Sequence, residues 1–208
     1  MASKDDRKAR IAEVKKAQKK AESRSGLLIV GGAALIGILI VGGSAFALIQ
    51  SQQEKDEIAA AAEKPIDGVE EYDDLSRNHV DTAVSYPQNP PVGGDHNPVW
   101  TNCGVYDGPV VTEQAVHSLE HGAVWIAHQP DLEQSELDTL VEVADSNSYV
   151  LLSPVEGIGS PIVLTAWGVQ LAVDSADDPR VETFVAKYQQ GPQTPEPGAA
   201  CTGGAGGM

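Results

Sequence analysis

Residues 26–49 are the feature that most constrains this chain: GLLIVGGAALIGILIVGGSAFALI runs for 24 residues without a charged side chain. A helix of that length crosses a hydrocarbon core about 30 Å thick. We therefore predict an uncleaved transmembrane helix over residues 26–49. The alternative is a signal peptide cleaved after Ala47, because Ala45-Phe46-Ala47 has the small-x-small pattern of a cleavage site. We favour the anchor, since the apolar run is longer than the core of such peptides.

Charges on the two sides of this run predict its orientation. Residues 1–24 carry nine of the 14 basic side chains and four acids, and Lys/Arg-rich flanks remain cytoplasmic. The chain is thus expected to be a single-pass protein of the cell membrane with its N-terminus in the cytoplasm. Its predicted parts are a basic cytoplasmic arm (1–25), the transmembrane helix (26–49), a stalk (50–65), an extracytoplasmic domain (66–190) and a flexible Pro/Gly-rich tail (191–208).

The part of the chain after residue 24 is strongly acidic. It holds 5 basic and 26 acidic side chains, a formal charge of −21. Such a surface repels phosphate backbones, so we expect no nucleic-acid partner. The expected partners are the membrane itself and another membrane protein.

Hydrophobic periodicity within 66–190 predicts an α+β domain. Apolar residues at helical spacing indicate three helices, and short β-branched runs indicate four strands. The helices are expected at 113–120, 132–144 and 179–188, and the strands at 123–128, 149–153, 162–167 and 169–173. Asp131 and Asp178 are the candidate N-caps of the second and third helices. We expect a small mixed or antiparallel sheet with packed helices.

The stretch HSLEHG carries the clearest chemical signal. His117 and His121 lie four residues apart on one face of the predicted helix, with Glu120 beside them. Histidines at that spacing can share a metal ion. His96, in the loop YPQNPPVGGDHNPVW, and Cys103 are further candidate ligands, and imidazole with thiolate suits copper or zinc. We therefore predict a binding or accessory domain with a transition-metal site.

Two alternatives remain at this point. HSLEH matches H-x-x-E-H, the inverted zincin pattern, which predicts a zinc-dependent hydrolase with Glu120 as the general base. We do not favour an enzyme, because the sequence offers no distinct third ligand and Gly122 ends the helix at once. In the metal-free alternative, the His and Glu side chains hydrogen-bond the proline-rich loop onto the helix and form a structural module for a membrane partner.

The sulfur of Cys103 has two possible roles, as a metal ligand or as one half of a disulfide bond. Cys103 and Cys201 both follow the predicted span, on the side where disulfides form. If they are bonded to each other, Cys103 is unavailable as a thiolate ligand. Spacing alone does not decide between the two possibilities.

Three segments together resemble a known family. YPQNPPVGGDHNPVWTNCGVYDGPV, AVHSLEHGAVWIAH and PIVLTAWG are similar to the bacterial domain-of-unknown-function family 3105, which is common in actinobacterial membrane-anchored proteins. The resemblance covers about His79 to Gln190 and implies a membrane-tethered extracytoplasmic domain. The positions that match the family's motif are His79, His96, Cys103, His117, Glu120 and His121. The resemblance implies no reaction.

Overall fold

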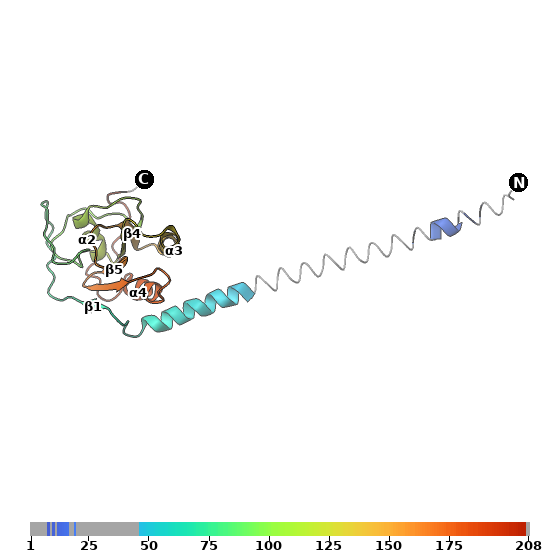
Figure 1. Cartoon of the computed structure of the whole chain (residues 1–208), viewed down its shortest axis with the longest axis horizontal. Helices are drawn as coiled ribbons and strands as arrows, with labels where there is room; N and C mark the ends of the chain where they lie inside the picture. Colours follow the sequence, from blue (N-terminus) through green and yellow to red (C-terminus); the bar gives the residue numbers. More distant parts are fainter. Residues whose placement is uncertain (1–7, 9, 11, 17–18, 20–45, 207–208) are drawn as a thin grey trace. The chain divides into compact units, whose positions relative to one another are not determined.

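The computed structural model describes residues 8, 10, 12–16, 19 and 46–206. Most of the predicted basic arm and of the transmembrane helix lies outside these residues; positions 46–49 belong to a helix that continues to residue 62. Within the described part, no helix is long and apolar enough to span a membrane. The chain divides into two compact units, 1–55 and 56–208, and the second contains the whole sheet (Figure 1).

A six-stranded mixed sheet forms the centre of the second unit, in the order β1-β6-β5-β3-β4-β2. Three neighbouring strands are parallel: β3 (Val124–His128), β4 (Val150–Pro154) and β2 (Gly104–Val105). The other half is antiparallel and consists of β5 (Ile162–Ala166), β6 (Val169–Val173) and β1 (Glu70–Glu71). This sheet confirms the mixed α+β class expected from the sequence.

Three helices cover the sheet: α2 (Thr112–Glu120), α3 (Gln134–Asp145) and α4 (Arg180–Tyr188). The sequence predicts Asp178 as the N-cap of α4, but Pro179 is the N-cap residue. Asp178 lies one position earlier, and its Oδ1 still accepts a hydrogen bond from the backbone N–H of Arg180 at 2.9 Å. The prediction for Asp131 is wrong. Glu133 is the N-cap residue of α3, and no side chain bonds the backbone there.

Alternate side chains of each strand point to opposite faces, and both faces are covered. On one face, residues such as Ile126 and Leu152 pack against Phe184 in a large apolar core shared with α3 and α4. On the other, Leu119 of α2 packs in a smaller cluster that includes Trp125. These are called the α3/α4 face and the α2 face below.

The described part of the C-terminal segment, 191–206, packs onto the α2 face, whereas the sequence predicts a flexible tail. A disulfide joins Cys201 to Cys103, with Cα atoms 5.4 Å apart. An isolated backbone bridge pairs Thr101 with Ala205, and the hydroxyl of Tyr149 donates to the carbonyl of Ala199 at 2.8 Å. Its Pro/Gly-rich sequence has no periodicity that could predict this packing.

Candidate metal centre

The proline- and glycine-rich loop 86–100 carries His96 onto α2. Gly93 and Gly94 have φ angles of +147° and +114°, and a Cβ on Gly93 would lie 2.8 Å from a neighbouring leucine side chain, so the turn requires glycine. The Nδ1–H of His96 donates to the carbonyl of Gly94 at 2.7 Å. Its Nε2 lies 3.0 Å from Oε2 of Glu120. The turn therefore places His96, fully buried, against the helix.

Backbone pairing adds His79, which in the sequence is marked only by the family resemblance. An isolated bridge pairs His79 with His96, and the N–H of Val80 donates to the carbonyl of His96 at 2.7 Å. Nε2 of His79 lies 3.6 Å from Oε2 of Glu120, and its ring stacks on that of His117 with centroids 4.8 Å apart. A one-residue bridge leaves no periodic pattern, so only the family resemblance marked this position.

The polar face of α2 is buried rather than solvated. His117 and Glu120 are 3% exposed and His121 is 5% exposed. The loop covers His117, whose Nδ1–H donates to the carbonyl of Asn97 at 2.6 Å. The C-terminal segment covers His121, whose Nδ1–H donates to the carbonyl of Ala200 at 2.7 Å. Two segments distant in sequence thus close over one helix face.

The three buried histidines use Nδ1 in the same way. A carbonyl oxygen only accepts hydrogen bonds, so these contacts place a hydrogen on Nδ1 of His96, His117 and His121. Each Nε2 then faces the cluster. Metal-ligating histidines are oriented by this kind of bond from the second ring nitrogen.

The Nε2 atoms of His117 and His121 lie 3.0 Å apart. Neutral rings with hydrogen on Nδ1 direct two lone pairs at each other here, an arrangement that is repulsive unless a proton or cation lies between them. Two nitrogens that each lie about 2.0–2.1 Å from one tetrahedral zinc ion are about 3.3 Å apart, so a shared ion would need the two rings to separate by a few tenths of an ångström. Burial lowers the pKa of His117 to about 4, so this ring is neutral at pH 7.

The candidate ligand atoms form two groups, and within each group they lie within 4.8 Å of one another. The four-ligand group consists of His79, His96, His117 and Glu120, and the three-ligand group of His117, His121 and Glu196. Glu196 comes from the C-terminal segment, and its Oε2 lies 3.5 Å from Nε2 of His121. Sequence reasoning missed it because nothing in a Pro/Gly-rich segment signals where it docks.

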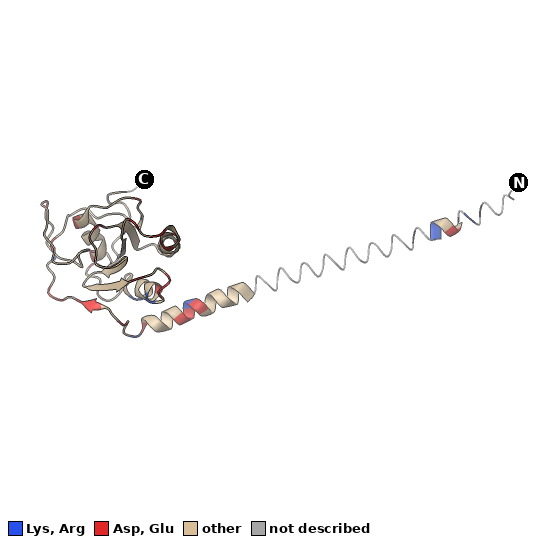
Figure 2. Cartoon of the chain, in the orientation of Figure 1, with Lys and Arg blue, Asp and Glu red and all other residues tan. Residues whose placement is uncertain are grey.

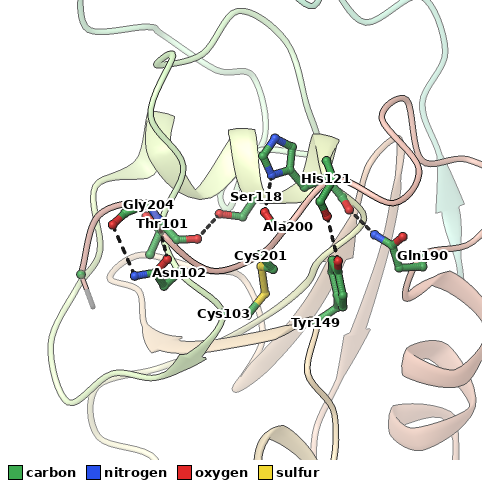
Figure 3. The surroundings of a disulfide bond; sticks show 12 residues. Thr101, Asn102, Cys103, Ser118, His121, Tyr149, Gln190, Ala200, Cys201 and Gly204 are labelled. Atoms are coloured by element: carbon green, nitrogen blue, oxygen red, sulfur yellow. Dashed lines mark hydrogen bonds between the residues drawn. A yellow bond between two sulfur atoms is a disulfide. The ribbon is translucent and has the colours of Figure 1, made fainter. Parts of the chain in front are cut away.

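Cys103 is not a ligand, which corrects one expected site residue. Its sulfur is bonded to Cys201, and a disulfide sulfur does not supply a thiolate. The backbone N–H of Cys103 also donates to the carbonyl of Cys201 at 2.8 Å. Figure 3 shows the disulfide beside the contact between His121 and Ala200. Cys103 therefore holds in place the segment that covers the site.

The donor set narrows the class of ion. Imidazole nitrogens and carboxylate oxygens suit zinc and divalent copper, whereas monovalent copper prefers thiolate and thioether sulfur. Both cysteines are in the disulfide, and the two methionines are at positions 1 and 208, outside the described residues. The described cluster thus offers only nitrogen and oxygen ligands.

Fold and site together define a mixed α+β domain with a buried histidine–glutamate cluster that a disulfide-tethered segment closes. Residues 79–203 match the family described as "Protein of unknown function (DUF3105)", and the chain belongs to this family. The match extends past Gln190, where the resemblance stated above ends, and includes Glu196 and Cys201. No curated protein and no solved structure matches the chain.

Proposed function

We propose that this chain is a single-pass membrane protein whose extracytoplasmic domain binds one divalent transition-metal ion, copper or zinc. The candidate ligands form two groups that share His117: His79, His96 and Glu120 complete one group, and His121 and Glu196 complete the other. A binding or accessory role, rather than catalysis, is the function that these contacts support best.

One observation carries the proposal. Nε2 of His117 and Nε2 of His121 lie 3.0 Å apart, while both Nδ1–H groups are already donated to backbone carbonyls. A cation shared by the two nitrogens removes the lone-pair repulsion at that distance. Two neutral rings that both carry hydrogen on Nδ1 have no hydrogen between their Nε2 atoms, so the repulsion remains.

The location rests on the sequence and on the disulfide. Residues 26–49 have the length and composition of a membrane span, with the basic flank before it. The bond between Cys103 and Cys201 suits an oxidising compartment outside the cytoplasm. Only five Lys and Arg follow residue 24, and Figure 2 shows how sparse they are on the domain, which argues against a nucleic-acid partner.

Hydrolysis by a zinc-bound water is the competing function, with Glu120 as the general base. Its Oε2 lies 3.0 Å from Nε2 of His96, so the carboxylate belongs to the ligand cluster instead of facing an open position. A cavity of about 830 Å³ is lined by His128 and Trp125, and no member of the two ligand groups lines it. This cavity therefore gives a substrate no access to the ligand cluster, and we favour binding.

A metal-free structural role is the second candidate, and specific contacts favour it. His96 and His117 already tie the proline-rich loop to α2, through Glu120 and through the carbonyl of Asn97. In this structural role, hydrogen bonds among the His and Glu side chains hold the cluster together without a metal ion. The two candidates differ in whether the domain takes up metal at all.

The test measures metal uptake by the full chain, purified in detergent. We expect one equivalent of Zn²⁺ or Cu²⁺ by elemental analysis, and His117→Ala should weaken binding at least about 100-fold in competition titrations. His128→Ala is the matched control, because His128 is buried but lies outside both ligand groups. Full folding without any bound metal, combined with unfolding of His117→Ala, would instead establish the structural role.

A further inference from the structure

The two ligand groups share one nitrogen. Nδ1 of His117 is bonded to the carbonyl of Asn97, so only Nε2 remains for a metal ion. One nitrogen lone pair holds one ion. The four-ligand and three-ligand groups are therefore alternative positions for a single ion, with His117 common to both.

The two positions differ in how complete they are. Three imidazoles and a carboxylate fill a tetrahedral shell, as in sites that retain their metal. The group of His117, His121 and Glu196 supplies three ligands, which leaves a coordination position open. Half of the Glu196 side chain is exposed, so the open position is accessible from solvent. An incoming molecule can supply the missing ligand there.

Glu196 is held in place by both local and distant contacts. Pro195 and Pro197 flank it and restrict its backbone. Its N–H donates to the carbonyl of Glu120 at 3.1 Å, and four residues on, the carbonyl of Ala200 accepts from His121. The disulfide follows immediately. A half-exposed carboxylate with this much support is positioned before any ion arrives.

We infer that His117, His121 and Glu196 form an exchange position through which a divalent metal ion reaches and leaves the four-ligand position. The ion moves by exchanging His121 and Glu196 for His79, His96 and Glu120 while it keeps His117. The protein then transfers metal to or from a partner that presents an imidazole or carboxylate, rather than retaining it permanently. This inference rests on the proposed function.

The experiment uses the full chain in detergent loaded with one equivalent of Co²⁺, whose visible absorption reports its ligands. Stopped-flow mixing with excess EDTA gives the rate of removal, and mixing apoprotein with Co²⁺ gives the rate of loading. We expect Glu196→Gln to slow both by at least about a factor of ten, the lower end of what weakened metal-site contacts cost. The dissociation constant should change less than about threefold, because Glu196 is absent from the four-ligand position that holds the ion at equilibrium. Glu182→Gln, in α4 and outside both groups, should leave both rates unchanged.

The possible outcomes separate the two proposals. Unchanged rates in Glu196→Gln would overturn the exchange position while leaving metal binding intact. An affinity loss in Glu196→Gln as large as that in His96→Ala would also overturn it, because all the ligands would then form one site. Failure of the wild-type chain to take up Co²⁺, Zn²⁺ or Cu²⁺ would instead remove the proposed function and the inference together.

Discussion

The two faces of the sheet are built by different means. On the α3/α4 face, 18 buried residues form one apolar cluster, supplied by regular strands and two amphipathic helices. On the α2 face the apolar cluster has nine buried residues, and the rest of the helix is covered by a loop and a C-terminal segment. One face is held by side-chain burial along regular elements. The other depends on hydrogen bonds, a disulfide and buried polar groups.

Stability and binding therefore depend on different faces of the sheet. Stabilisation by apolar burial is non-directional and does not require a bound metal ion. Buried imidazoles and a carboxylate are costly unless their partners are present. The α3/α4 face should therefore determine whether the domain folds, and the α2 face what it binds.

The largest expected effect is on the α3/α4 face. Phe184→Ala removes a fully buried ring, and we expect a loss of about 3–5 kcal/mol in the free energy of unfolding, because a cavity remains in the core. Urea titration measures the loss, and Val111→Ala, at a half-exposed position, is the control expected within about 0.5 kcal/mol of wild type. A loss in Phe184→Ala of under about 1 kcal/mol would show that the α3/α4 face does not dominate the stability of the domain.

Removing the disulfide tests the α2 face. The double variant Cys103→Ser/Cys201→Ser opens a link between residues 98 apart in sequence, and we expect a loss of about 2–5 kcal/mol. Metal exchange should slow as well, since Glu196 and the carbonyl of Ala200 lose their anchor. Denaturation and stopped-flow removal of Co²⁺ by EDTA measure the two effects. Unchanged exchange rates would mean that the C-terminal segment docks without the bond.

A single substitution at Gly204 tests the docking of the C-terminal segment and changes neither a cysteine nor a candidate ligand. A Cβ on Gly204 would lie 2.7 Å from Cδ1 of Trp100 and would also meet its backbone, so Gly204→Ala should cost about 1–3 kcal/mol. Gly159→Ala has open space around the added carbon and is the matched control. Equal melting temperatures for the two variants would argue against close packing of this segment.

The smallest effect concerns pH and the N-terminus of α4. Hydrogen bonds from Arg180 hold the pKa of Asp178 below its ordinary value of 3.8. A depressed carboxylate pKa contributes stability above the unfolded-state pKa, and this contribution is lost as the pH falls from about 4 through the folded-state value. Asp178→Ala should thus cost about 1 kcal/mol at pH 7 and progressively less below pH 4. Urea midpoints from pH 7 to pH 2 measure this, with Asp177→Ala as the neighbouring control; a pH-independent difference would contradict the assignment.

The same contrast explains what the sequence could predict. Periodicity locates α2, α3 and α4 and the strands β3 to β6, because local patterns follow directly from burial on a regular element. It does not find β1, whose two glutamates carry no hydrophobic signal and pair only through the backbone. The register and strand order also remain open, since they depend on contacts distant in sequence.

The candidate site shows the same limit. His117, Glu120 and His121 follow from helical spacing, and His96 from its unusual loop. Glu196 reaches the cluster because the C-terminal segment packs back onto the α2 face, which no local sequence pattern predicts. His79 reaches it through a single backbone bridge to His96. The cysteine pairing, which the sequence leaves open, then decides against Cys103 as a ligand.

The long span of the disulfide also sets an order of events during biosynthesis. Ala200, which orients His121, is synthesised 79 residues after it, and Cys201 follows Cys103 by 98. A nascent chain that has exposed HSLEH therefore lacks both the carbonyl that fixes the ring and the glutamate beside it. The three-ligand group is therefore complete only after Glu196 has been synthesised, whereas the four ligands His79, His96, His117 and Glu120 all precede the C-terminal segment.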